Sequence, residues 1–251
     1  MQSWGSKQLV GVLQTLGRAL QDLLLPPRCP ICHELVAGAD QLHICADCLA
    51  ALPRVASPVC SICGIPFDGA GSDHPCSRCL QTPPPYAAAR AALRYEGACR
   101  DLIHRFKYDF KSHLRRPLGL LTAHLLADFA NQQQPDLLVP VPLHVSRLRH
   151  RGFNQAVLLG EVLSHQWQIP LLRQGLKRTR PTTPQIELTF EQRTHNLHNA
   201  FSVTNSSAIR DRRIMLVDDV FTTGSTLAAS ALALRQAGCH SVSAVTVAHA
   251  P

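Results

Sequence analysis

Long uninterrupted apolar runs are missing from this sequence, and their absence argues against a helix that crosses a membrane. The strongest apolar run lies within residues 1–27, but four polar residues interrupt it: Gln14, Arg18, Gln21 and Asp22. No small-residue cleavage site follows the run, as a signal peptide would require. We therefore expect residues 1–27 to form an amphipathic helix that docks on protein or lies on a membrane surface. The protein is expected to be cytoplasmic, with no transmembrane segment.

Aromatic residues are also scarce, at 5% of the chain, yet hydrophobic residues make up 45% of its 251 positions. That apolar content is enough for one large domain together with a small one. Cysteine is nearly absent outside one short segment, since only Cys99 and Cys239 lie elsewhere. We expect these two to be buried small hydrophobes.

The other eight cysteines form four Cys-x-x-Cys pairs: Cys29 and Cys32, Cys45 and Cys48, Cys60 and Cys63, and Cys76 and Cys79. The last two pairs repeat the first two at an offset of 31 residues, so the segment is a duplicated unit. In a reducing compartment this pattern indicates metal binding rather than disulfides. A redox-active pair would need a thioredoxin-like context that the sequence lacks.

Each repeat holds a complete ligand set for one zinc ion, because two tight turns together offer four thiolates in a tetrahedron. Such a closed site leaves no position for a catalytic water, so we expect two structural Zn²⁺ ions in a double zinc ribbon over residues 28–82. We choose consecutive pairing within each repeat, and crossed pairing remains open. His33, His43 and His74 are expected at the surface rather than as ligands. The ribbons are also a candidate surface for a protein partner.

Near the C-terminus, the apolar residues 214–217 precede Asp218 and Asp219, and a helical pattern begins at Leu227. Between them lies a hydroxyl-rich turn: Thr222, Thr223, Gly224, Ser225 and Thr226. The pattern predicts a buried strand, a loop and a helix whose first N–H groups and dipole favour a phosphate. Adjacent carboxylates would be costly beside a bare phosphate, so we expect them to face ribose hydroxyls or Mg²⁺.

The run from Ile214 to Thr226 resembles the phosphoribosyl pyrophosphate (PRPP) motif of type I phosphoribosyltransferases. The resemblance implies that Asp218 and Asp219 contact the ribose hydroxyls, directly or through metal, and that residues 222–226 hold the 5′-phosphate. We expect an α/β domain over residues 86–251, after a linker of three prolines, with a largely parallel sheet flanked by helices. Its strands are expected near 90–95, 137–141, 200–204, 213–217 and 241–248.

Two basic segments fit a pyrophosphate. A loop over residues 143–154 carries Arg147, Arg149 and Arg151, whose guanidinium groups suit bidentate contacts with phosphate. A second segment from residue 177 to 185 contains Arg178 and Arg180 among prolines and threonines, which is typical of a mobile loop that closes over a substrate.

With the paired ribbons and the run Phe106-Lys107-Tyr108, these segments make the chain from about residue 26 onward resemble the ComF family of competence-type proteins. The resemblance implies a phosphoribosyltransferase fold and a link to DNA uptake or use. It leaves three classes of function open: a Mg²⁺-dependent phosphoribosyltransferase using Asp218, Asp219, Arg147 and Arg151, a non-catalytic module that binds PRPP or a nucleotide, and a structural adaptor. No residue identifies the acceptor.

Charge is distributed unevenly along the chain. Residues 83–251 carry 20 basic and 11 acidic side chains, whereas the ribbons carry more acids than bases. Five basic residues recur at helical spacing and would line one face of a single helix: Arg100, His104, Lys107, Lys111 and Arg115. This stripe is either a solvated helix face or, together with the arginine loop, a track for single-stranded DNA.

Overall fold

The computed structural model describes residues 27–36, 42–109, 111–179 and 200–250. The chain divides into two compact units, residues 1–51 and residues 52–251. The described part of the first unit holds the first four cysteines and a short helix, α2 (Ala46–Ala50). The helix expected over residues 1–27 lies outside the described residues, apart from Pro27.

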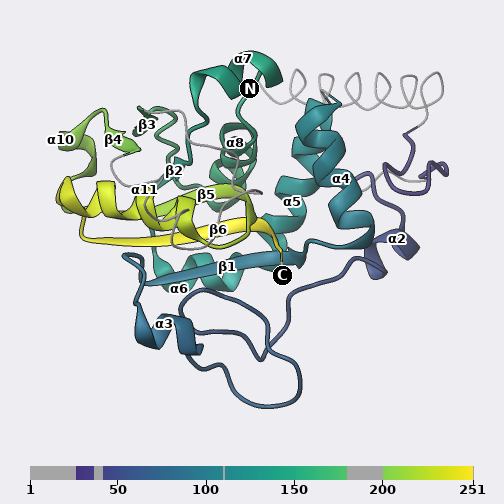
Figure 1. Cartoon of the computed structure of the whole chain (residues 1–251). Coiled ribbons are helices and arrows are strands. Elements are labelled where there is room, and N and C mark those ends of the chain that lie inside the picture. Colours follow the sequence, from purple (N-terminus) through teal and green to yellow (C-terminus); the bar gives the residue numbers. More distant parts are fainter. Residues whose placement is uncertain (1–26, 37–41, 110, 180–199, 251) are drawn as a thin grey trace, which may run out of the picture. The chain divides into compact units, whose positions relative to one another are not determined.

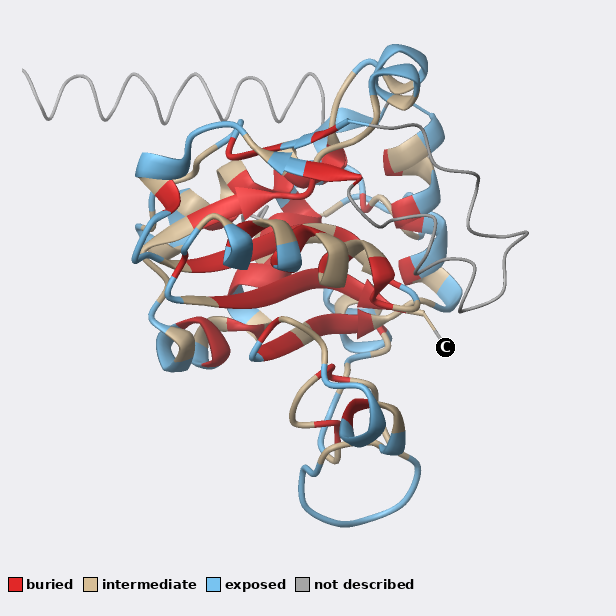
Figure 2. Cartoon of the chain, turned by 60° about the vertical axis from the view of Figure 1, so that its left-hand side comes forward, coloured by how far each residue is buried: buried red, intermediate tan, exposed pale blue. Residues whose placement is uncertain are grey.

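The second unit is built on a four-stranded parallel sheet (Figure 1). Its strands are β1 (Ala88–Arg94), β2 (Leu137–Pro140), β5 (Arg213–Phe221) and β6 (Ser241–His249), in the order β1-β6-β5-β2. The strands are buried along most of their length (Figure 2), as expected for a parallel sheet that is covered on both faces. The predicted parallel sheet flanked by helices is therefore confirmed.

Successive side chains of β5 point to opposite faces of this sheet. Leu216 packs in a core cluster with Leu227 and Leu234 of α11 (Ser225–Gln236). Val217 instead borders a small void between α5 (Arg115–Leu125) and α8 (Gln155–Trp167). The core cluster on the α11 face also includes three cysteines of the second ribbon: Cys60, Cys63 and Cys79. The second ribbon, with its helix α3 (Ser77–Gln81), is thus part of the same packed core as the sheet.

Other helical elements of the second unit lie around the sheet. They are α4 (Gly97–Tyr108), a 3₁₀ turn η1 (Ser112–Leu114), α6 (Ala127–Gln133) and α10 (Ser206–Ile209). A separate antiparallel pair consists of β3 (Leu176–Arg178) and β4 (Phe201–Val203). The strand expected near 200–204 therefore forms, but it pairs with β3 outside the central sheet. In turn, β5 extends beyond its expected end, because residues 218 to 221 continue the ladder with β6 as far as His249.

The prediction of a basic loop over residues 143–154 is wrong in its central part, because these residues form the helix α7 (Val145–Arg151). The side chain of His144 accepts a hydrogen bond from the amide of Ser146 and caps the first turn. Gly152, with φ +74°, ends the helix in the left-handed conformation. Local capping at both ends thus stabilises a helix whose surface is mainly basic.

The prediction of a basic stripe on one helix face is also wrong, because residues 100 to 115 do not form a single helix. Helix α4 ends at Tyr108, and Lys111 has a non-helical backbone before the 3₁₀ turn. A new helix, α5, starts at Arg115 and has Pro117 in its first turn, where the missing proline N–H costs no hydrogen bond. Lys107 itself points away from solvent, as its contacts show below.

Candidate functional site

The eight repeat cysteines form two clusters, one in each unit, and each cluster comes from consecutive pairs. The members are Cys29, Cys32, Cys45 and Cys48 in the first, and Cys60, Cys63, Cys76 and Cys79 in the second. Within each cluster the sulfur atoms lie within 4.8 Å of one another. The geometry selects consecutive pairing over crossed pairing.

The sulfur positions fit zinc. The Sγ atoms of Cys32 and Cys45 are 3.7 Å apart, and those of Cys63 and Cys76 are 3.8 Å apart. A tetrahedron with Zn–S bonds of about 2.3 Å has edges of about 3.8 Å. The amides of Cys63 and Cys76 donate to Sγ of Cys60 at 3.4 and 3.2 Å. Burial would raise the pKa of Cys60, but hydrogen bonds from these amides, from the backbone of Ile62 and from the Cys63 side chain together outweigh burial and lower the pKa to about 6. Cys60 thus favours the thiolate, the form that binds metal.

The two ribbons differ at one equivalent position, Gly64 in the second repeat and His33 in the first. Both residues have a left-handed backbone, with φ +73° and +66°. A β-carbon at Gly64 would lie 2.5 Å from the carbonyl oxygen of Ala89 in β1, so glycine is required there for close approach of the sheet. His33 is exposed and meets no such constraint.

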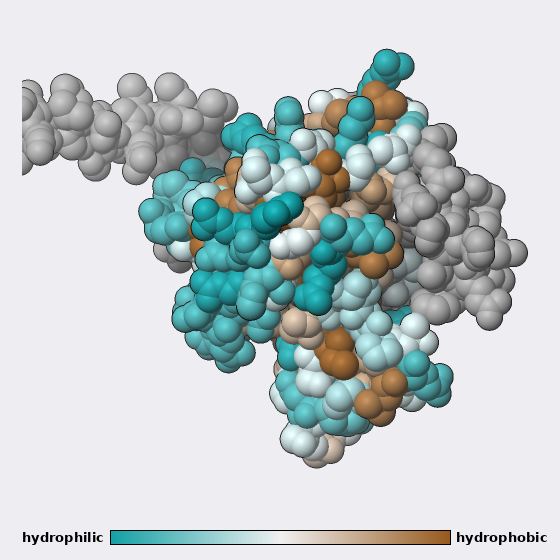
Figure 3. All heavy atoms as spheres, turned by 90° about the vertical axis from the view of Figure 1, so that its left-hand side faces the viewer, coloured by the Kyte–Doolittle hydropathy of each residue, from teal (hydrophilic) through white to brown (hydrophobic). Residues whose placement is uncertain are grey.

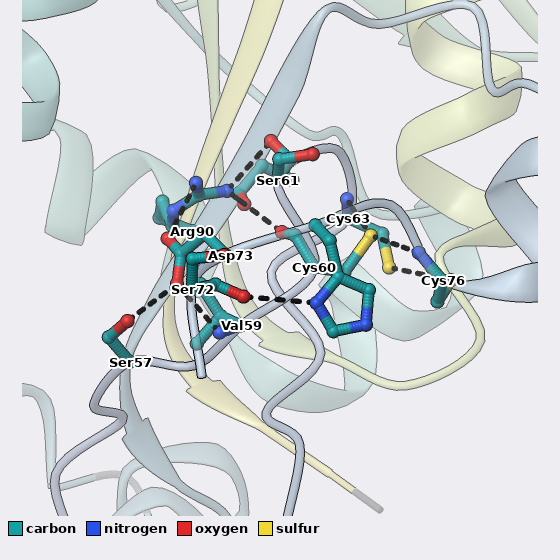
Figure 4. A network of polar contacts seen from close by, with 11 residues as sticks. Ser57, Val59, Cys60, Ser61, Cys63, Ser72, Asp73, Cys76 and Arg90 are labelled. Atoms are coloured by element: carbon teal, nitrogen blue, oxygen red, sulfur yellow. Dashed lines mark hydrogen bonds and ion pairs between the residues drawn. The ribbon is translucent and has the colours of Figure 1, made fainter. Parts of the chain in front are cut away.

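Arg90 of β1 joins the second ribbon to the sheet (Figure 4). Its guanidinium donates to the carbonyl oxygens of Cys60 and Ser61 at 3.3 and 3.2 Å and lies 3.9 Å from the carboxylate of Asp73. The amide of Ala89 donates to the carbonyl oxygen of Ile62 at 2.7 Å. These contacts hold the turn that carries Cys60 and Cys63 against β1, so the second zinc site is coupled to the sheet.

The two adjacent acids lie at the carboxyl end of β5, where ligands bind in open parallel sheets. The amide of Asp219 donates to Oδ1 of Asp218 at 2.9 Å. Desolvation by the surrounding protein and the neighbouring charge of Asp219 raise the pKa of Asp218 to about 7. The charges of Lys107 and Arg178 oppose this rise. The site therefore concentrates negative charge that a ligand with hydroxyl donors would relieve.

Lys107 of α4 is a neighbour of the acid pair, although the sequence analysis placed it on the basic stripe. Its Nζ atom lies 2.9 Å from Oδ1 of Asp219, and the two side chains are 15% and 12% exposed. Burial would lower the pKa of Lys107, but the charge and hydrogen bond of Asp219, together with the charge of Asp218, outweigh burial and raise the pKa. The sequence spacing is consistent with this inward position. Lys107 follows Cys99 and Ile103 at four-residue intervals, so the three residues lie on one helix face, and Cys99 and Ile103 are fully buried.

The hydroxyl-rich turn connects β5 directly to α11. Gly224 has φ +76° and precedes the first residue of the helix, Ser225. The hydroxyls of Thr223 and Ser225 are 2.8 Å apart, and the amide of Ser225 donates to Oγ1 of Thr223 at 3.4 Å. Thr222 is exposed and Thr226 lies in the first turn of α11. The turn therefore gathers hydroxyls and helix-terminal N–H groups of the kind that bind a phosphate.

A cavity of about 260 Å³ lies beside this turn. Its lining includes Thr223, Gly224 and Ser225 of the turn, and Cys63 and Cys79 of the second ribbon. Figure 3 views the side of the unit on which α10 and α11 lie, and it shows apolar atoms scattered among hydrophilic ones. The second ribbon and the turn thus border one cavity.

Arg178 lies close enough to Asp218 to interact with its charge, and Arg147 lies near Arg178, whereas Arg151 makes other contacts. Burial and the nearby charge of Arg147 lower the pKa of Arg178 to about 10, against the opposing charge of Asp218. Arg151 donates to the hydroxyl of Tyr108 at 3.2 Å and lies over its ring at 4.9 Å. Arg180 lies outside the described residues, as does most of the loop expected to close over a substrate.

Two family models match the chain. A double zinc ribbon domain matches residues 20–80, and a phosphoribosyl transferase domain matches residues 156–251. These matches agree with the two four-cysteine clusters and with the parallel sheet. Among the helices that the structure describes, none is long and apolar enough to span a membrane.

Curated relatives cover more than half of the chain. It is 39% identical over 145 residues to competence protein F of Haemophilus influenzae, a match that spans 56% of this chain and 63% of that protein. It is 35% identical over 163 residues to DNA utilization protein YhgH of Escherichia coli, spanning 64% of this chain and 71% of that protein. It is 30% identical over 162 residues to competence protein ComFC of Bacillus subtilis, spanning 63% of this chain and 62% of that protein.

Proposed function

The chain belongs to the ComF family of competence and DNA utilization proteins, and on that premise we propose that it binds PRPP or a nucleotide at the carboxyl end of β5. A role in DNA uptake or utilisation is part of the proposal, because the names of its relatives state competence and DNA utilization. One observation carries the proposal. Asp218 and Asp219 lie one short turn from the start of α11, so carboxylates and phosphate donors share one edge of the sheet.

We assign each part of a phosphorylated ribose to one group of residues. The turn from Thr222 to Thr226 would hold the 5′-phosphate by its hydroxyls and by the N-terminus of α11. Asp218 and Asp219 would accept hydrogen bonds from ribose hydroxyls. Arg178, which lies near Asp218, and Arg147, which lies near Arg178, would bind the pyrophosphate.

In a transferase these same charges would promote loss of the pyrophosphate. Positive groups held in place before the reaction stabilise charge that develops on a leaving group without reorganisation. The buried guanidinium of Arg178 meets this description, since it is 9% exposed and packs over the ring of Phe201. When bound with PRPP, Mg²⁺ would supply further neutralisation of the pyrophosphate charge.

The test is a titration of the full chain with PRPP, followed by a pyrophosphate-release assay against a panel of bases and nucleic-acid ends. The parent should bind PRPP, and Asp218→Asn combined with Asp219→Asn should remove binding while the fold remains intact, because asparagine matches aspartate in shape. Binding by this double variant with the affinity of the parent would disprove the ribose assignment.

Turnover separates a transferase from a binding module. Lys177 is exposed in β3, at the start of the segment expected to close over a substrate. In a transferase, Lys177→Ala should abolish pyrophosphate release and leave PRPP affinity within about threefold of the parent. In a non-catalytic module the parent itself should bind PRPP and release no pyrophosphate with any acceptor.

A second candidate function is the binding of single-stranded DNA by α7 and the end of α4. Tyr108 is 49% exposed and lies under the guanidinium of Arg151, while Arg149 is exposed on the same helix. An exposed aromatic ring among basic side chains suits stacked bases and a phosphate backbone. Arg149→Ala should weaken binding of an oligonucleotide and reduce its salt dependence. Arg212→Ala, an exposed residue at the opposite end of β5, is the matched control and should have little effect.

A further inference from the structure

Lys107 holds its positive charge against the acid pair. Its Nζ atom is 2.9 Å from Oδ1 of Asp219, and both side chains are largely removed from solvent. Asp218 and Tyr95 also lie close enough to act on this charge. The contact is therefore a buried ion pair at the position where a phosphorylated ribose would bind.

A divalent cation would have to compete with this ion pair. Mg²⁺ requires a near-octahedral shell of oxygen ligands, and the ammonium group already donates to one oxygen of Asp219. An ion that bridged Asp218 and Asp219 would bring two further positive charges beside a buried ammonium. Displacing Lys107 instead would separate a buried ion pair, which is strongly unfavourable. The acid pair therefore does not fit a bridging metal ion while Lys107 remains in place.

We propose, building on the function proposed above, that Lys107 is a positioning residue that serves as the built-in counter-ion of Asp218 and Asp219, so that these carboxylates bind ribose hydroxyls without a bridging metal ion. The ligand class follows from this role. Phosphorylated riboses that lack a pyrophosphate, such as ribose 5-phosphate, should bind equally well with and without Mg²⁺. Any Mg²⁺ dependence of PRPP binding then comes from its pyrophosphate.

Calorimetric titration of the full chain with ribose 5-phosphate tests this role, once in EDTA and once in excess MgCl₂. The Kd of the parent should change by less than about twofold between the two buffers. Lys107→Met should weaken binding in EDTA by about tenfold or more and regain part of the affinity with Mg²⁺, because the uncompensated carboxylates then accept a cation. Lys107→Arg preserves the charge and should keep binding independent of metal.

Lys111→Met is the matched control, since it removes the same charge from an exposed residue outside the ion pair. It should behave like the parent in both buffers. A parent Kd that tightens about tenfold on addition of Mg²⁺ would overturn the inference, even if Lys107→Met fails to fold. An unchanged, metal-independent Kd in Lys107→Met would also overturn it. If ribose 5-phosphate does not bind the parent while PRPP does, this inference fails and the proposed function stands. If neither binds, or if both bind regardless of Asp218→Asn and Asp219→Asn, the proposed function fails and this inference fails with it.

Discussion

Gly224→Ala should destabilise the second unit, because this glycine joins the turn after β5 to α11 in a conformation and a space that suit no other residue. Its φ of +76° is left-handed, which costs an L-residue about 1–2 kcal/mol. An added β-carbon would lie 2.6 Å from Cζ of Phe221. That ring is buried and stacks on His249 with centroids 4.8 Å apart, so it has little room to move. Overpacking of this kind costs about 1–3 kcal/mol, and the two costs together predict a loss of about 2–5 kcal/mol.

Equilibrium unfolding in urea measures this loss. Gly97→Ala is the matched control, because Gly97 also has a positive φ, +48°, but a β-carbon there would meet nothing within 4 Å. The control should therefore lose only the conformational cost of about 1–2 kcal/mol. Equal losses at Gly97 and Gly224 would refute the argument that Phe221 restricts this turn.

Three further predictions concern the second ribbon and the acid pair. Gly64→Ala should lower the melting temperature, because its β-carbon would lie 2.5 Å from the carbonyl oxygen of Ala89. Asp218→Asn should remove a pH dependence of stability: the pKa of Asp218 is raised from 3.8 to about 7, so the folded parent binds more protons than the unfolded chain and loses up to about 4 kcal/mol as pH rises through this range. Thermal unfolding across pH measures this difference. Cys76→Ser should reduce bound zinc from two ions to one per chain, as determined by metal analysis of the purified protein.

Each of these has a distinct contradicting outcome. An unchanged melting temperature for Gly64→Ala would show that the ribbon does not approach β1 closely. Identical pH profiles for the parent and Asp218→Asn would show that Asp218 ionises normally. Loss of both zinc ions from Cys76→Ser would show that the two clusters depend on each other.

Features set by short-range spacing could be predicted from the sequence. The Cys-x-x-Cys repeat specifies each pair of ligands, because two intervening residues place both sulfurs on one side of a tight turn. Which two pairs share an ion remained open in the sequence and is given by the structure. The strand, the turn and the helix between Arg213 and Gln236 also form in the expected order. In the sequence an apolar run, a turn with a glycine and a helical pattern follow one another directly. The position of the acids at the end of β5 follows from this order alone.

Features that depend on distant partners could not be predicted in the same way. The stripe that included Lys107 and Lys111 assumed a helix that continues past Tyr108, and the register of basic residues gives no sign of where a helix ends. The partner of Lys107 is Asp219, which lies more than a hundred residues away in the sequence. Similarly, β4 has the composition of a core strand, but its pairing with β3 is decided by tertiary contacts.

The central claim is that a phosphorylated ribose binds at the end of β5 and the start of α11. Hydrogen–deuterium exchange of the full chain, with and without saturating PRPP, tests it directly because it locates the bound ligand along the backbone. We predict slower exchange in peptides that contain Asp218 to Thr226, with little change in the ribbon around Cys45 and Cys48. Bound PRPP that leaves exchange at residues 218–226 unchanged would contradict the account.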